Sequence, residues 1–172
     1  MPESLTFDEA CARLRDLMEQ SLGLLITHPS GNQRAFRLTA EYTDEDIAGF
    51  EEHWEVTFPP AYRKFLIEVG AGELCYGGGV KGRSVHRLED IPELYAEYID
   101  ETTEGVFARL QPIGCDYGRR EVAAFCLDRP GPLNFALFPC DADPLEWIEE
   151  ADAQSSWRRF EDWIIEAAED RV

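Results

Sequence analysis

One segment of the chain comes close to a phosphate-binding loop without matching it. Residues 77–84 read GGGVKGRS, whereas a P-loop reads G-x-x-x-x-G-K-[ST], so Arg83 stands where that motif has its lysine. A P-loop also joins a strand to a helix, but Val85 to Leu88, which follow here, have the composition of a strand. We therefore interpret Glu73 to Ser84 as a glycine-rich loop or irregular hairpin and not as a nucleotide site.

The histidines and cysteines give no metal-binding pattern. His28, His53 and His86 are far apart, so no two of them lie one helical turn apart as zinc ligands on a helix would. A nucleophilic pair such as Cys75 with His86 stays open, but nothing in the sequence marks either residue as activated. We expect no catalytic residue, no metal and no cofactor. The scattered cysteines lack a C-x-x-C pair and are typical of reduced thiols in a cytosolic protein: Cys11, Cys75, Cys115, Cys126 and Cys140.

Acidic residues dominate the charge of the chain. There are 35 Asp and Glu against 16 Lys and Arg, which gives a formal net charge of −19. With so many carboxylates, adjacent pairs such as Glu51-Glu52 are inevitable and are weak evidence for the two-carboxylate catalysis of glycosidases. A charge of this sign repels nucleic acids and anionic membranes and attracts basic protein partners. Solubility alone is the competing explanation.

Two short helices joined at a Pro-Pro pair are the elements that would position other residues. Their pattern spans Ile47 to Gly72, IAGFEEHWEVTFPPAYRKFLIEVGAG. Pro59 and Pro60 cannot continue the first helix but suit the first turn of the second. Gly70 and Gly72 can take the left-handed conformation that ends a helix. Two apolar stripes at helical spacing define the pair: Ile47, Phe50 and Trp54, then Tyr62, Phe65, Leu66 and Val69.

Capping and turn residues divide the rest of the chain. Thr6 and Thr43 each precede an acidic residue by three positions, which is the spacing of a capping box at a helix start. Ser155 or Ser156 is predicted to cap the last helix. Short turns separate three predicted strands at the C-terminal side, which indicates an antiparallel meander. We predict an α+β fold, a mainly antiparallel sheet with helices packed around it. The other expected elements are a short strand or extended arm at 34–42, strands at 85–88, 107–113, 122–127 and 133–138, a helix from 91, and a short helix or turn at 144–150.

The four tryptophans are expected mainly in the core. Trp54, Trp157 and Trp163 lie on helical stripes, which favours packing inside. Trp147 lies in the acidic segment EWIEEAD and is the best candidate for an exposed interface residue. Even for Trp147, packing against the last helix is the favoured interpretation.

The helix–Pro–helix–glycine pattern resembles the core of the SUKH superfamily. That superfamily contains bacterial toxin-immunity proteins, the yeast cell-wall-synthesis regulator and the bacterial Syd protein. Leu110 to Gly114, two later strands and a closing helix at 156–167 also resemble it, which extends the likeness to about residues 43–168. The motifs are structural and imply a fold more than an activity. The residues that carry the resemblance are Ile47, Glu51, Phe58, Pro59, Tyr62, Phe65, Leu66, Gly70 and Gly72.

The resemblance implies one SUKH-like domain over residues 1–172, with an N-terminal helical extension at 1–42. The role of that extension is not assigned, because its helix could cover the sheet or pair with another chain. The first residues, MPESLTFDEA, lack the apolar stretch of a secretory signal, and no run of about 18 apolar residues is present. We therefore expect a cytoplasmic protein without membrane insertion; its oligomeric state stays open.

The resemblance also implies a function without chemistry, namely binding and neutralising a polymorphic toxin, often a nuclease or another basic enzyme. The acidity agrees, because a basic toxin exposes Lys and Arg for an anionic substrate and carboxylates compete for those groups by charge-assisted hydrogen bonds. We expect a protein partner and no nucleic acid. The alternative is a housekeeping interaction or regulatory module with a cellular partner.

Three loops combine acidic and aromatic residues at the ends of predicted strands, where binding residues are common. The outer face of the helix Glu93–Glu101 is a rival surface, and ordinary turn residues are the structural alternative. The predicted partner-binding residues are Glu73, Tyr76, Asp116, Tyr117, Asp141 and Asp143.

Overall fold

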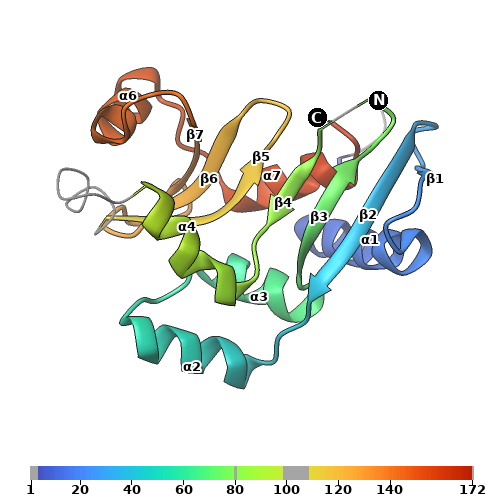
Figure 1. Ribbon diagram of the computed structural model, residues 1–172, viewed down its shortest axis with the longest axis horizontal. Coiled ribbons are helices and arrows are strands. Elements are labelled where there is room, and N and C mark those ends of the chain that lie inside the picture. Colours follow the sequence, from blue (N-terminus) through green and yellow to red (C-terminus); the bar gives the residue numbers. More distant parts are fainter. Residues whose placement is uncertain (1–3, 80, 99–108, 172) are drawn as a thin grey trace.

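The protein is an antiparallel sheet covered by helices, as a computed structural model shows it (Figure 1). The structure describes residues 4–79, 81–98 and 109–171. Seven strands in these ranges pair in sequence order, each antiparallel to the next, so the α+β meander is confirmed. The strands are β1 (Ile26–Thr27), β2 (Gln33–Ala40), β3 (Ala71–Tyr76), β4 (Arg83–Val85), β5 (Leu110–Asp116), β6 (Glu121–Cys126) and β7 (Phe135–Pro139).

Helices lie on both sides of this sheet. The α-helices are α1 (Phe7–Ser21), α2 (Asp44–Trp54), α3 (Pro60–Glu68), α4 (Ile91–Tyr98), α6 (Trp147–Gln154) and α7 (Phe160–Ala168), and two 3₁₀ turns are η1 (Leu88–Asp90) and η2 (Pro144–Glu146). Figure 1 shows α1 and α7 behind the sheet, α4 in front of it and α2 at its margin. No helix in the described ranges has the length and apolar character needed to cross a membrane.

Two apolar clusters fill the two faces of the sheet. Strand β6 is buried on both faces, so alternate residues join different clusters. Phe125 packs with Phe135, Tyr62 and Phe160 in the larger cluster, where ring centroids lie 5.3 to 5.6 Å apart. Val122 and its alternate neighbours pack in the smaller cluster with α6. The larger cluster takes residues from α1, α3 and α7.

The N-terminal helix covers the sheet. Phe7 at the start of α1 meets Phe160 of α7 edge to face, with ring centroids 6.3 Å apart. Leu14, Leu17 and Met18 of the same helix are buried in the larger cluster. Because α1 shares its core with α7, we propose that residues 1–172 fold as one domain.

Local sequence signals located the helix starts well, with one exception. Thr6 and Thr43 form complete capping boxes with Glu9 and Asp46, as predicted. Pro60 opens α3. The last helix is different, because its N-cap is Arg159 and Ser155 instead ends α6 in a left-handed conformation. The prediction of a serine cap was therefore wrong.

Several helix and strand boundaries in the structure differ from the predicted ones. The segment expected as a glycine-rich loop or irregular hairpin at 73–84 is a hairpin, since it contains most of β3 and the start of β4, which pair antiparallel. The strand expected at 85–88 begins earlier, as β4, and is followed by the turn η1. The predicted arm at 34–42 is β2. Gly70 does take the left-handed conformation, with φ +95°, but Gly72 lies inside β3, where a Cβ would lie 2.2 Å from the Arg37 carbonyl oxygen. The expected residues at 99–101 of the helix and 107–108 of the strand lie outside the described ranges.

Gly114 is required by close packing between two strands. A Cβ at this position would lie 2.0 Å from the Ser84 carbonyl oxygen of β4. We expect Gly114→Ala to lower the free energy of unfolding by about 1–3 kcal/mol or more, since backbone must move to admit the methyl group. The measurement is urea unfolding followed by circular dichroism.

Gly49 provides the matched control, because it lies inside α2 with open space around its Cα. Gly49→Ala is expected to stabilise the protein by roughly 0.5–1 kcal/mol through helix propensity. Equal effects of the two substitutions would contradict the strand-packing argument.

Candidate functional site

Four of the six predicted binding residues come together at one end of β3, β4 and β5. Glu73, Tyr76 and Tyr117 line a pocket of about 290 Å³ together with Lys81, Gly82 and Arg83. Asp116 and Tyr117 line an adjoining pocket of about 370 Å³, which also includes Lys81. We call the residues that line these two pockets the sheet-end surface. Asp141 and Asp143 are exposed and lie in the turn that follows β7. Asp143 caps η2 by accepting a hydrogen bond from the Leu145 amide. Asp141 directly follows Cys140, which lines the second pocket.

Asp116 does not face outward as a binding residue would. It is 4% exposed, and one carboxylate oxygen accepts from Arg83 Nε at 3.1 Å. The other oxygen accepts from the backbone amides of Gly118 and Arg119, each at 3.1 Å. Its carboxylate therefore holds its own turn and a buried arginine.

The other predicted residues of the sheet-end surface are better exposed, and Glu73 is the acidic residue among them. Tyr117 is 46% exposed. Glu73 forms an ion pair with Arg37 at 2.7 Å, and the Tyr76 hydroxyl donates to the Gly23 carbonyl at 3.2 Å. With Lys81 in both pockets, the sheet-end surface combines aromatic rings with mixed charge.

The Cys-His pair considered from the sequence does not form. The Cys75 thiol donates to Asp170 Oδ1 at 2.9 Å, and burial is the main cause that raises its pKa to about 12. His86 Nε2 lies instead 3.4 Å from Cys115 Sγ. A buried thiol with a raised pKa is a poor nucleophile.

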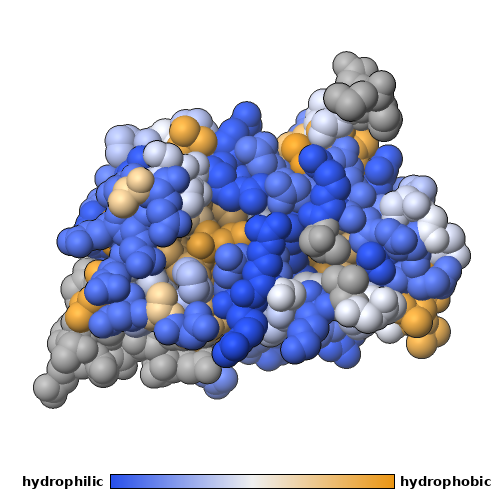
Figure 2. All heavy atoms as spheres, turned by 90° about the horizontal axis from the view of Figure 1, so that it is seen from above, coloured by the Kyte–Doolittle hydropathy of each residue, from blue (hydrophilic) through white to orange (hydrophobic). Residues whose placement is uncertain are grey.

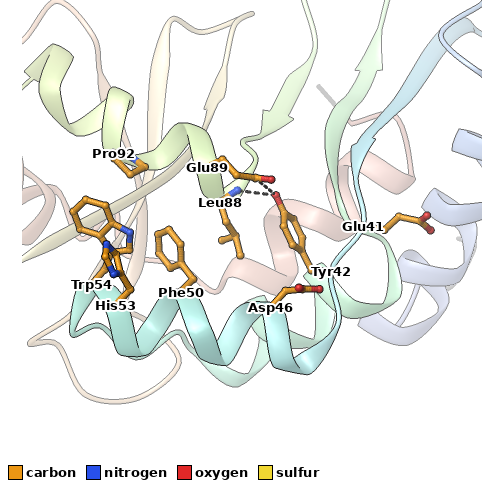
Figure 3. A pocket seen from close by; sticks show the side chains of 9 residues that line it. All are labelled: Glu41, Tyr42, Asp46, Phe50, His53, Trp54, Leu88, Glu89 and Pro92. Carbon is orange, nitrogen blue, oxygen red and sulfur yellow. Dashed lines mark hydrogen bonds between the residues drawn. The ribbon is translucent and has the colours of Figure 1, made fainter.

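A second concave site, which the sequence analysis missed, lies between α2 and the η1–α4 segment (Figure 3). We call it the helix cleft; its volume is about 570 Å³. Figure 3 shows Phe50 and Trp54 pointing from α2 toward Leu88 and Pro92 on the opposite side. The lining residues are Glu41, Tyr42, Asp46, Phe50, His53, Trp54, Leu88, Glu89 and Pro92.

Aromatic rings form much of this cleft. Trp54, expected in the core, is 48% exposed, so that prediction was wrong. Its ring lies 6.2 Å from Phe50 and 5.2 Å from His53, measured between centroids. Among the residues of α2, Ile47 is the one that is buried. Asp46, Phe50 and Trp54 follow the i, i+4, i+8 spacing of one helix face, and this signal was present in the sequence.

Two hydrogen bonds of Tyr42 connect the two sides of the cleft. The Tyr42 hydroxyl donates to Glu89 Oε2 at 2.6 Å and accepts from the Leu88 amide at 2.8 Å, which joins the end of β2 to η1 (Figure 3). Burial is the main cause that raises the pKa of Tyr42, so this hydroxyl keeps its proton at neutral pH. Bonds to the Thr43 amide and hydroxyl lower the pKa of Asp46, which therefore stays charged.

The remaining tryptophans are structural. Trp147 is 1% exposed and stacks on Phe138 with ring centroids 5.2 Å apart, so it packs inside and is not an exposed interface residue. Trp157 and Trp163 are also buried. Around these elements the surface is largely hydrophilic; Figure 2 shows smaller hydrophobic areas between polar groups on one face.

Comparison with known proteins places both concave sites in a matched region. Residues 41–166 match the model of the SMI1 / KNR4 family (SUKH-1). The Immunity protein RhsIB of Dickeya dadantii (strain 3937) is 24% identical over 135 residues, which cover 78% of this chain and 79% of that protein. The match to the family begins at Glu41, the first residue of the helix cleft, and α1, β1 and β2 precede it.

Proposed function

Because the chain belongs to the SMI1 / KNR4 (SUKH-1) family, we propose that it is an immunity protein, which binds a protein toxin and neutralises it without a chemical step. The observation that carries the proposal is the likeness to an immunity protein over about four fifths of both chains. The acidity of the chain supports a basic toxin domain, such as a nuclease, as the partner. We place this binding in the cytoplasm.

Three side chains that could carry chemistry are instead engaged in holding the fold, which supports a binding role. The Cys75 thiol donates a hydrogen bond to the Asp170 carboxylate, and the Asp116 carboxylate accepts one from the Arg83 guanidinium. Neutralisation would then follow from covering the toxin's substrate surface. In this mechanism affinity comes from a few buried side chains and the rate of encounter from charge.

Co-expression of this protein with a toxin domain, if one is found among the neighbouring genes, provides the test of the proposal. Co-expression of the two chains should restore growth of a bacterial host that the toxin alone kills. The purified chains should also form a complex whose dissociation constant rises steeply with salt. Growth arrest despite full expression, together with no complex at low salt, would overturn the proposal.

Within this proposal, the exposed residues of the sheet-end surface and the turn after β7 contact the partner. Asp116 is excluded as a direct contact because its carboxylate is internal. Asp141→Lys combined with Asp143→Lys should weaken capture about 10-fold at low salt and flatten its salt dependence. Adding Tyr117→Ala should weaken it by roughly a further 10- to 30-fold through lost buried area. The measurement is calorimetric titration at several salt concentrations.

A control variant separates a local contact from the net charge. Asp16→Lys with Asp162→Lys makes the same change of charge at exposed positions on α1 and α7. The control should change capture less than about 3-fold at 150 mM salt, where distant surface charges are screened. If both double variants weaken capture equally, the loops after β5 and β7 are not the interface.

A further inference from the structure

The helix cleft has the composition of a receptor for a single positively charged side chain. We infer that it binds an arginine side chain of the protein partner, with the guanidinium between the aromatic rings of α2 and the carboxylate of Glu89. This inference rests on the proposed function, because it names a group that the partner must present.

Charge is the first argument. Three of the nine lining residues are carboxylates, Glu41, Asp46 and Glu89, and the nine include no Lys or Arg. The excess extends beyond the cleft, since the segment EYTDEDIAGFEEHWE at 41–55 contains no Lys or Arg, although Arg63 of α3 pairs with two of its carboxylates. Its acidic residues are Glu41, Asp44, Glu45, Asp46, Glu51, Glu52 and Glu55. A concave site lined by one sign of charge concentrates ligands of the opposite sign.

These carboxylates keep acceptor capacity despite their internal contacts. Among the described residues, Glu89 bonds through Oε2 to Tyr42, and Asp46 bonds through Oδ2 to Thr43. Glu41 pairs through Oε1 with Arg15 at 2.6 Å. All three are exposed. Figure 3 shows the Glu41 carboxylate pointing away from Phe50 and Trp54, so Asp46 on α2 and Glu89 on η1 are the carboxylates that can accept from a ligand in the cleft. Each ionised carboxylate can accept on two oxygens.

The exposed aromatic side chains are the second, independent argument. Trp54 is the exposed tryptophan among the described residues, since the other three are each less than 9% exposed. The Phe50 ring stacks on the buried Phe58 with centroids 5.5 Å apart, and the Trp54 ring lies against Phe50 in a tilted arrangement. A cation is attracted to the face of an aromatic ring, and tryptophan is the strongest such acceptor.

Together these features favour arginine over lysine. A guanidinium is planar, stacks on aromatic rings and carries five donors in a fixed geometry, whereas an ammonium is a compact and strongly hydrated charge. The apolar floor at Leu88 and Pro92 suits the methylene groups of a long side chain. Since Pro92 lines the helix cleft and Leu94 lines the sheet-end surface, a partner lying across α4 would reach both sites.

The experiment uses the full chain and small probes before any toxin. N-acetyl-arginine methylamide is titrated at pH 7.5 and constant ionic strength while ¹H–¹⁵N spectra report the Trp54 indole and the Glu89 amide. We expect saturable shifts with a dissociation constant on the order of 1–10 mM, as for one weak cation site. The neutral isostere N-acetyl-citrulline methylamide should bind more than about 10-fold more weakly.

Three substitutions test whether the arginine probe binds in the helix cleft. Trp54→Ala and Glu89→Gln should each weaken arginine binding about 5-fold or more. Glu52→Gln removes the same charge from an exposed position of α2 outside the cleft lining, and it should change binding less than about 2-fold. Thermal unfolding of each variant checks that the fold is retained.

The outcomes separate this inference from the proposed function. No saturable shift up to about 100 mM arginine probe, or equal binding of the citrulline and arginine probes, overturns the arginine site; so does preference for N-acetyl-leucine methylamide, which would indicate an apolar occupant. If the toxin is captured normally by Trp54→Ala and Glu89→Gln, the arginine site is not part of the interface and the immunity function stands. If arginine binds the cleft but no toxin is captured, the immunity proposal fails and the cation site remains.

Discussion

Replacing Arg83 with methionine is expected to lower the free energy of unfolding by about 3–5 kcal/mol, because it leaves a buried carboxylate without its counter-charge. The Arg83 side chain is fully buried, and its Nε lies 3.1 Å from Asp116. The same guanidinium donates to the Trp163 carbonyl at 2.8 Å and to the Arg171 carbonyl at 3.2 Å. It thereby joins β4 and β5 to α7 and the C-terminal residues. Urea unfolding at pH 7, followed by tryptophan fluorescence, measures the loss.

An exposed arginine provides the comparison for this prediction. Arg109 pairs with Asp128 at 2.6 Å, and both side chains are 50% exposed. Arg109→Met should change stability by less than about 1 kcal/mol, since solvent screens the pair. A double variant, Arg83→Met with Asp116→Asn, should recover part of the loss, because the unpaired charge is gone while the side-chain oxygen can still accept from the Gly118 and Arg119 amides. If Arg83→Met costs no more than Arg109→Met, the buried guanidinium does not hold these elements together.

The helix starts and the pairing of the three C-terminal strands could be predicted because they depend on neighbours in the sequence. Thr6 and Thr43 cap their helices through residues three positions later, and Pro60 fixes its own backbone angle. Strands joined by short turns can pair with few alternatives, which made the meander predictable. The cap of α7 failed because Phe135 pairs with Arg158, and this long-range bridge keeps the chain extended up to Arg159.

Burial of charged residues could not be predicted, since it depends on distant partners. Arg83 lies in a glycine-rich segment that suggests a surface loop, yet its partners Asp116 and Glu166 are 33 and 83 residues away. Asp116 was therefore placed in a binding loop from its sequence neighbours alone. The apolar stripe of α2 was also ambiguous. A stripe shows which residues share a face but not how completely another element covers it, and Trp54 is left half exposed in the helix cleft.

The two candidate sites show the same difference between what depends on sequence neighbours and what depends on distant elements. Glu73, Tyr76 and Tyr117 meet because β3, β4 and β5 are adjacent and their ends lie together, which the meander implied. The helix cleft has walls from α2, the end of β2 and the η1–α4 segment. Nothing in the sequence specifies that α2 lies across a cleft from the η1–α4 segment, so the acidic and aromatic face of α2 could be interpreted only as a core stripe until the structure placed it.

Acid should unfold the protein in part through one carboxylate, Asp170. Burial acts to raise its pKa, but four donors outweigh burial and leave the pKa well below the usual value: the Cys75 thiol, the Asn32 amide, the Ser30 hydroxyl and the Arg34 guanidinium. A carboxylate with a lowered folded-state pKa stabilises the protein fully above its unfolded-state value, which is about 3.9 for Asp. That contribution falls as the pH drops from about 5 toward the folded-state pKa.

Asp170→Asn isolates this charge, because asparagine nearly matches the shape of aspartate and tolerates the left-handed backbone, here φ +60°. We expect a loss of about 2–3 kcal/mol at pH 7, since the nearly buried Arg34 loses its counter-charge. The loss should shrink as the pH falls below about 4, where wild-type Asp170 becomes protonated during unfolding. Asp128→Asn, in the exposed pair with Arg109, should cost less than about 1 kcal/mol at pH 7. Urea unfolding of the three proteins from pH 3 to 8 measures the loss at pH 7 and its pH dependence. A loss for Asp170→Asn that does not depend on pH would show that the second acceptor oxygen, not the charge, secures the C-terminal residues against β2 and β3.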